Sequence, residues 1–105
     1  MKKNLFLIIE GKVFKVNYVR TSKVLDSPTA GLIDYMKGVI CISTDRPRDA
    51  QDETLLHEII HGILPPSTRD EEKFVEVFAP RLFGVLKTNG LWRSPLESKE
   101  GNTVG

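Results

Sequence analysis

Residues 54–63 read Thr-Leu-Leu-His-Glu-Ile-Ile-His-Gly-Ile, and this stretch decides both the fold and the chemistry that we expect of the chain. Its apolar residues recur at helical spacing, which predicts an α-helix. Residues four apart lie one above the other on one face of a helix, so His57 and His61 can bind a single metal ion. Glu58 lies one residue further round, where a base acting on a metal-bound water is needed. The alternative, an amphipathic helix with two surface histidines, is less favoured because spacing, glutamate and helical pattern agree.

Composition limits the classes of protein to consider. The chain has 105 residues, enough for one domain with a modest core, and 40% hydrophobic and 28% charged residues are typical of a globular protein. The 15 basic and 14 acidic residues are scattered, so we expect neither direct nucleic-acid binding nor membrane association. The single cysteine excludes an internal disulfide, and Leu5–Ile9 is too short for a signal peptide. We therefore expect a cytoplasmic protein of undetermined oligomeric state.

Two β-hairpins are expected before the helix. Leu5–Ile9 is a short apolar run, Glu10-Gly11 is turn-like, and Lys12–Arg20 alternates apolar and polar residues. Gly31–Met36 and Val39–Ser43 form the second hairpin, and the apolar run in Val39–Ser43 suggests a strand covered on both faces. The prediction is an α+β fold, in which a small antiparallel sheet of two hairpins packs on the active-site helix and on a second helix.

The active-site helix should run from Arg48 to Leu64 and end at Pro65-Pro66. Its predicted buried stripe consists of Leu56, Ile59, Ile60 and Ile63.

A second helix should run from Thr68, in a capping box with Glu71, to about Lys87. Pro80 should bend this helix or split it in two. Its apolar residues at helical spacing are Phe74, Val75, Phe78, Leu82, Val85 and Leu86. Leu91-Trp92 is expected to fold back, so that residues 1–93 form one domain and residues 94–105 a flexible tail.

Two histidines do not complete a catalytic zinc site, which typically has three protein ligands and an open position for water. Among the acidic residues downstream, Glu72 and Glu76 share a face of the second helix that can look back at the histidines. We prefer Glu72 as the third ligand, with Glu76 second, because the capping box would occupy Glu71. Cys41 is a rival, since a thiolate on a strand completes this motif in peptide deformylases. The flanking motifs of those enzymes are missing, which favours a buried structural thiol.

Two segments together resemble a known family. The motif of residues 54–61, followed by Glu72-x-x-Val75-Glu76-x-Phe78-Ala79, is similar to the minimal zinc metallopeptidases of the ImmA/IrrE type, especially the small stand-alone forms of phages and mobile elements. The resemblance implies one Zn²⁺ per chain on His57, His61 and Glu72, with Glu58 as the catalytic acid and base. It also implies a protein or peptide substrate, such as a DNA-binding repressor.

The predicted function is metal-dependent hydrolysis of a peptide bond. Tyr35 and Arg81 are candidates to stabilise the oxyanion, and Val39–Ser43 is a candidate edge strand for an extended substrate. The alternative is a catalytically weak zinc-binding module that acts through a protein partner. The presence of Glu58 favours the enzyme, because a purely structural zinc site has no need of a base and usually has four ligands.

Overall fold

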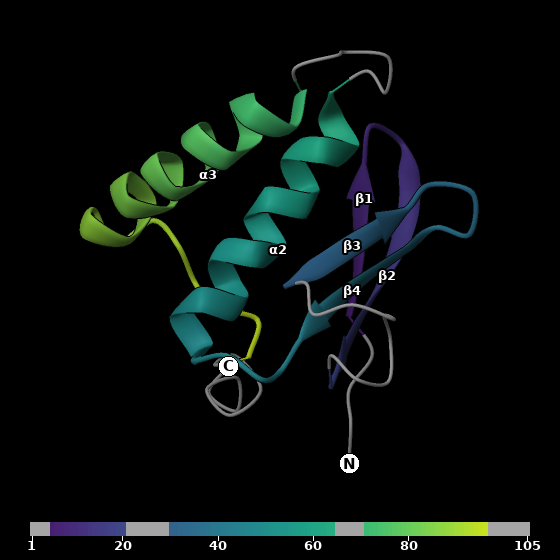
Figure 1. The fold of residues 1–105 in the computed structure, drawn as a ribbon, viewed down its shortest axis with the longest axis horizontal. Helices are drawn as coiled ribbons and strands as arrows, with labels where there is room; N and C mark the ends of the chain where they lie inside the picture. Colours follow the sequence, from purple (N-terminus) through teal and green to yellow (C-terminus); the bar gives the residue numbers. More distant parts are fainter. Residues whose placement is uncertain (1–4, 21–29, 65–70, 97–105) are drawn as a thin grey trace.

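The structure, a computed structural model, describes residues 5–20, 30–64 and 71–96. Its α+β fold consists of a four-stranded sheet and two long helices, as predicted (Figure 1). The helices are α2 (Arg48–Ile63) and α3 (Glu71–Thr88), and the strands are β1 (Leu5–Ile9), β2 (Lys12–Val19), β3 (Gly31–Asp34) and β4 (Val39–Ser43). Helix α2 thus ends within one residue of the bound predicted for it. In the described residues, no helix is long and apolar enough to cross a bilayer.

The sheet is mixed rather than antiparallel throughout, which corrects the prediction. Both hairpins form as expected, and Glu10 and Gly11 make the first turn with positive φ at both positions. However, β2 and β4 pair in parallel, so the strand order is β1-β2-β4-β3. The apolar run of residues 39–42 accounts for this, because a central position buries Ile40 and Ile42 completely. Val39–Ser43 is therefore an inner strand, and the prediction that it forms an edge is wrong.

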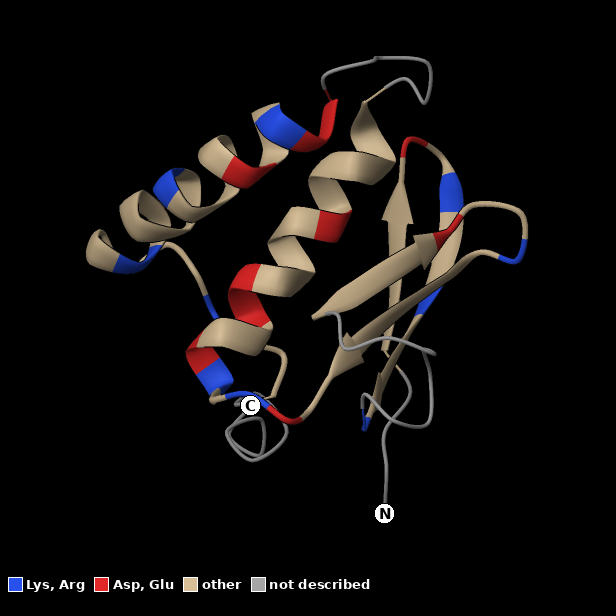
Figure 2. Cartoon of the chain, viewed as in Figure 1, with Lys and Arg blue, Asp and Glu red and all other residues tan. Residues whose placement is uncertain are grey.

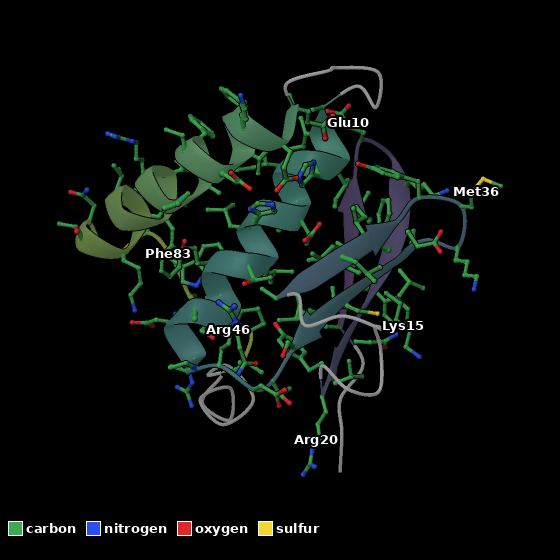
Figure 3. All side chains as sticks on the ribbon, viewed as in Figure 1. Glu10, Lys15, Arg20, Met36, Arg46 and Phe83 are labelled. Atoms are coloured by element: carbon green, nitrogen blue, oxygen red, sulfur yellow. The ribbon has the colours of Figure 1, made fainter. Side chains whose placement is uncertain are left out.

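Helix α2 lies between the sheet and α3, so the molecule has two apolar cores (Figure 1). Towards the sheet, Leu55 joins a cluster of residues from β1, β2 and β4. Towards α3, Leu56 and Ile60 pack on one face of that helix. The α3 members of this second core are Val75, Ala79 and Phe83, the last of which is labelled in Figure 3. A helix buried on two sides needs apolar residues beyond a single stripe, which explains why Leu55 was missed.

The predicted burial fails at helix positions that face neither core. Ile63 is 50% exposed, because α2 ends there beyond the edge of its contacts. On α3, Phe74, Phe78 and Val85 lie outside the face that packs on α2, so these three residues are exposed among the described residues. Of the two alternatives predicted at Pro80, a bend or a split, the split is wrong. The helix is continuous, and both Glu76 and Pro80 are exposed, so the carbonyl that loses its amide partner lies on the solvent side.

The segment after α3 folds back onto α2 through Trp92, as expected, whereas Leu91 is 70% exposed. Packing continues further along the chain than predicted. Ser94 is 5% exposed, and its hydroxyl donates to Asp52 Oδ1 over 3.0 Å. Trp92 Nε1–H donates to the other oxygen of Asp52 over 3.1 Å, and its ring meets Phe83 edge-on. The expected flexible tail therefore does not begin at Ser94, and residues 97–105 lie outside the described part. Residues 21–29, Pro65-Pro66 and Thr68 lie outside it as well.

Candidate metal centre

Helix α2 presents His57 and His61 on the side that faces α3 and the end of β3. Their ring centroids are 4.9 Å apart, as the four-residue spacing on one helical face requires. The two side chains are 23% and 14% exposed, so both are accessible but largely enclosed. The histidines therefore form an accessible pair on a rigid helix.

Glu72, in the first turn of α3, reaches both histidines. Its Oε1 lies 2.8 Å from His61 Nε2, and its Oε2 lies 3.4 Å from His57 Nε2. One ligand atom from each of the three residues lies within 4.8 Å of the others. Ligand atoms about 2.0–2.2 Å from a tetrahedral zinc are about 3.4 Å apart, so the three groups need only small movements to hold one ion. Their donor set of two imidazoles and a carboxylate fits zinc.

The other candidate ligands are not brought into this group. Glu76 lies one turn further along α3 on an exposed part of the helix and is not a member of the cluster. Cys41 alternates with the inward-facing Ile40 and Ile42 on β4, so its half-buried thiol points to the opposite side of the sheet from α2. Among the described residues, the geometry thus distinguishes Glu72 from both alternatives.

Glu58 lies beside the pair of histidines and is only 6% exposed. Burial raises the pKa of its carboxyl to about 7, and the negative charge of Glu72 adds to the rise while His61 opposes it. A Cβ atom placed on Gly31 of β3 would lie 3.5 Å from Glu58 Oε2. That distance is an ordinary van der Waals contact, so Gly31 borders this carboxylate, and the close approach it permits is to Thr54 of α2, whose Cγ2 would lie 2.8 Å from that Cβ.

Glu71 was missed as a member of the site. Sequence reasoning assigned it to a helix cap, whereas the structure places its carboxylate in a short contact with His61 Nδ1. Glu71 is buried, and with Glu72 it places a carboxylate at each nitrogen of one imidazole ring. The available signal was the pair of consecutive glutamates opposite the histidines, but the capping pattern was the stronger local signal.

The two histidines differ in their electrostatic surroundings. Burial lowers the pKa of His57, and the carboxylates of Glu72 and Glu76 oppose this only in part. Burial also acts to lower the pKa of His61, but its contacts with Glu71, Glu58 and Glu72 outweigh burial and raise it. With a carboxylate at each nitrogen, His61 of the metal-free protein favours the imidazolium form, and a metal ion would replace the proton on Nε2.

A cleft of about 490 Å³ opens over these residues. One wall is formed by residues 31–33 of β3 and by Tyr35, and the other by the helix residues that carry the site. The Tyr35 hydroxyl donates to the main-chain oxygen of His61 over 2.8 Å, so this candidate oxyanion donor lies at the cleft but is already engaged. Arg81 does not line the cleft. It lies nine residues beyond Glu72, which is about 13 Å along the helix axis.

Comparison of the chain with protein-family models, with curated proteins and with solved structures finds no match. The functional argument therefore depends on the residues of the site and their arrangement.

Proposed function

We propose that this protein is a zinc-dependent metallo-endopeptidase, which hydrolyses a peptide bond with a metal-activated water. The observation that carries the proposal is the convergence of His57, His61 and Glu72 within 4.8 Å, beside a buried glutamate in an open cleft. Three ligands and a free position are typical of catalytic zinc sites, whereas structural sites usually have four ligands. Glu58 is the feature that a binding site alone would not require.

In this mechanism, His57, His61 and Glu72 hold one Zn²⁺. The ion, when bound, supplies a Lewis acid that polarises the substrate carbonyl and lowers the pKa of water to about 7. Glu58 accepts a proton as water adds to the carbonyl carbon, and it then delivers that proton to the leaving amine. The C–N bond breaks, and the products are a carboxylic acid and an amine. Burial, which raises the pKa of Glu58, suits this carboxyl to both steps near neutral pH.

The substrate is an extended segment of a protein or peptide. Strand β3 is an edge of the sheet and lines the cleft, so a substrate strand that pairs with β3 would pass beside the metal ligands. In this proposal the edge strand that pairs with the substrate is Gly31–Asp34, whereas the sequence suggested Val39–Ser43 for that role. The family resemblance extends the proposal to a regulatory protein, such as a repressor, as the substrate. Lysine and arginine are scattered over both helices and the strands (Figure 2), so direct binding of nucleic acid is not part of the proposal.

The decisive experiment combines metal analysis with the Glu58→Gln substitution. Native mass spectrometry of the zinc-loaded wild type should show one zinc per chain, and Glu58→Gln should retain it. Cleavage of a quenched-fluorescence peptide library should fall by at least about 10²-fold in Glu58→Gln, because the base is lost. Glu76→Gln is the matched control and should cleave like the wild type. A wild type that remains metal-free in excess zinc, or an active Glu58→Gln variant, would refute the proposal.

A second candidate function is a zinc-stabilised module that binds a protein partner. It is favoured by a groove on the outer face of α3, lined by Phe74, Val77 and Phe78 between Lys73 and Arg81, where the two phenylalanine rings stack 5.1 Å apart. This function predicts zinc binding without cleavage of any peptide in the library. It also predicts that Glu58→Gln leaves partner binding unchanged while Phe74→Ser weakens it.

A further inference from the structure

The first turn of α3 makes different carboxylate contacts with the two histidines. Glu71 and Glu72 are consecutive and reach opposite nitrogens of the His61 ring, Glu71 at Nδ1 and Glu72 Oε1 at Nε2 over 2.8 Å. In the part of the chain that the structure describes, no second carboxylate takes the place of Glu71 at His57 Nδ1. The site is therefore asymmetric, because among the described residues a carboxylate contacts the Nδ1 of His61 but none contacts the Nδ1 of His57.

We propose that Glu71 is a positioning residue, whose carboxylate accepts the Nδ1–H of His61 and thereby presents Nε2 of that ring to the metal. The inference rests on the proposed zinc site and adds a residue that does not itself touch the ion. A neutral imidazole carries one N–H, and a carboxylate at Nδ1 fixes that hydrogen there. The lone pair is then on Nε2, which is the atom that faces Glu72 and the cleft. Such a hydrogen bond also makes the imidazole a stronger donor to the metal.

The surroundings of Glu71 fit a positioning residue better than an ordinary surface charge. Its side chain is 11% exposed and that of Glu72 is 60% exposed, so the carboxylate behind the ring is the more enclosed of the two. A buried carboxylate needs partners, and His61 is the partner that the structure provides. Both glutamates also lie in the first turn of α3, where the helix dipole favours negative charge. The helix dipole therefore offsets part of the cost of placing two acids side by side, one to bind and one to orient.

The test measures zinc affinity by competition with a chromophoric chelator in wild type, Glu71→Gln, Glu71→Ala and the control Glu76→Gln. We expect Glu71→Ala to bind zinc about 10–100-fold more weakly than wild type. Glu71→Gln should lose less, because its amide oxygen still accepts the hydrogen bond without the charge. Glu76→Gln should stay within about twofold of wild type, because its exposed side chain lies outside the group of ligand atoms and acts on His57 through its charge alone. Thermal unfolding of the metal-free variants separates lost folding from lost affinity, and Glu71→Gln serves if Glu71→Ala does not fold.

Two spectroscopic readouts test the positioning role. The first, a nitrogen shift, would not change if Glu71 merely supported the fold, and the second, a cobalt spectrum, distinguishes positioning from direct ligation. Long-range ¹H–¹⁵N spectra of the zinc-bound protein should show His61 protonated at Nδ1, and Glu71→Ala should shift that nitrogen while leaving His57 in place. Cobalt-substituted Glu71→Gln should keep the ligand-field bands of wild type, whereas Glu72→Gln should not. Equal zinc affinity in Glu71→Ala and Glu76→Gln would overturn the positioning role, as would a changed cobalt spectrum in Glu71→Gln, which would make Glu71 a ligand. A wild type that binds no zinc would refute the proposed function as well, so the two failures are distinguishable.

Discussion

Asp52 ties the C-terminal segment to α2, and its replacement by alanine is a sharp test of how this fold is held together. The residue is 1% exposed, and its two carboxylate oxygens accept separate hydrogen bonds from Trp92 Nε1 at 3.1 Å and the Ser94 hydroxyl at 3.0 Å. Hydrogen bonds to a charged group contribute about 1.5–3 kcal/mol each. Part of this gain is offset, because burial raises the pKa of Asp52 and so makes its charged form costly.

The net effect of Asp52→Ala should be a loss of about 2–4 kcal/mol in the free energy of unfolding, from a total of about 5–15 kcal/mol. Trp92 is the only tryptophan in the chain, and its ring lies edge-on to Phe83 with a centroid distance of 5.5 Å. Urea unfolding followed by tryptophan fluorescence therefore reports on the tie itself. In the folded variant, the emission of Trp92 should shift to the red, because the indole loses its partner and gains water.

Asp49→Ala is the matched control on the same helix. Asp49 is 67% exposed and pairs with Lys87 Nζ at 3.2 Å, a surface ion pair that should contribute less than about 1 kcal/mol. If Asp52→Ala and Asp49→Ala lose equal stability and the emission of Trp92 does not move, the reasoning about the buried tie is refuted.

Three further predictions follow from the same structure. Zinc at 100 times its dissociation constant should raise the free energy of unfolding by about 2.7 kcal/mol in calorimetry, and His57→Ala should abolish this gain; an equal gain in the variant would exclude the site. Gly31→Ala should lower the free energy of unfolding in urea by about 1–3 kcal/mol, because the added Cβ would lie 2.8 Å from the Cys41 main-chain oxygen and from Thr54 Cγ2. Gly84→Ala is the control, and because open space surrounds Gly84 it should stabilise α3 by about 0.5–1 kcal/mol. The pKa of Asp52 is raised by burial, so the folded state binds the proton more tightly and the contribution of Asp52 to stability falls as pH rises from about 4 through its folded pKa. The stability difference between wild type and Asp52→Asn should therefore shrink over that range in urea titrations, and a growing difference would contradict the assigned direction.

The parts of this protein that the sequence predicts are those set by local spacing. The four-residue interval between His57 and His61 defines a helical face, and residues close in the chain remain close in the fold. The same reasoning predicts that Glu72 lies opposite the histidines, because a second helix that follows a short connection turns back on the first. The two hairpins were equally local, since Glu10-Gly11 is a turn signal between two strand patterns.

The parts that the sequence did not predict depend on partners far apart in the chain. The parallel pairing of β2 with β4 has no local signature, and it made Val39–Ser43 an inner strand instead of an edge. The tie from Asp52 to Ser94 joins residues 42 positions apart, so a polar segment that looked loose proved to be anchored. Glu71 was missed for a different reason. Its capping pattern is real as a pattern, and only the position of His61 in space shows where the carboxylate goes.

The contact between α2 and α3 is fastened by polar groups at both ends, with Leu56, Ile60, Val75 and Ala79 between them. At one end are the proposed metal ligands, and at the other are the Lys87–Asp49 pair and the Asp52 tie. If zinc binds as proposed, it would join the two helices where Glu72 meets His57 and His61, opposite the end held by the Lys87–Asp49 pair. Binding of zinc would slow amide exchange at the start of α3 far more than at its end. The exchange rates in the first turn of α3 would therefore report how much of the zinc site is occupied.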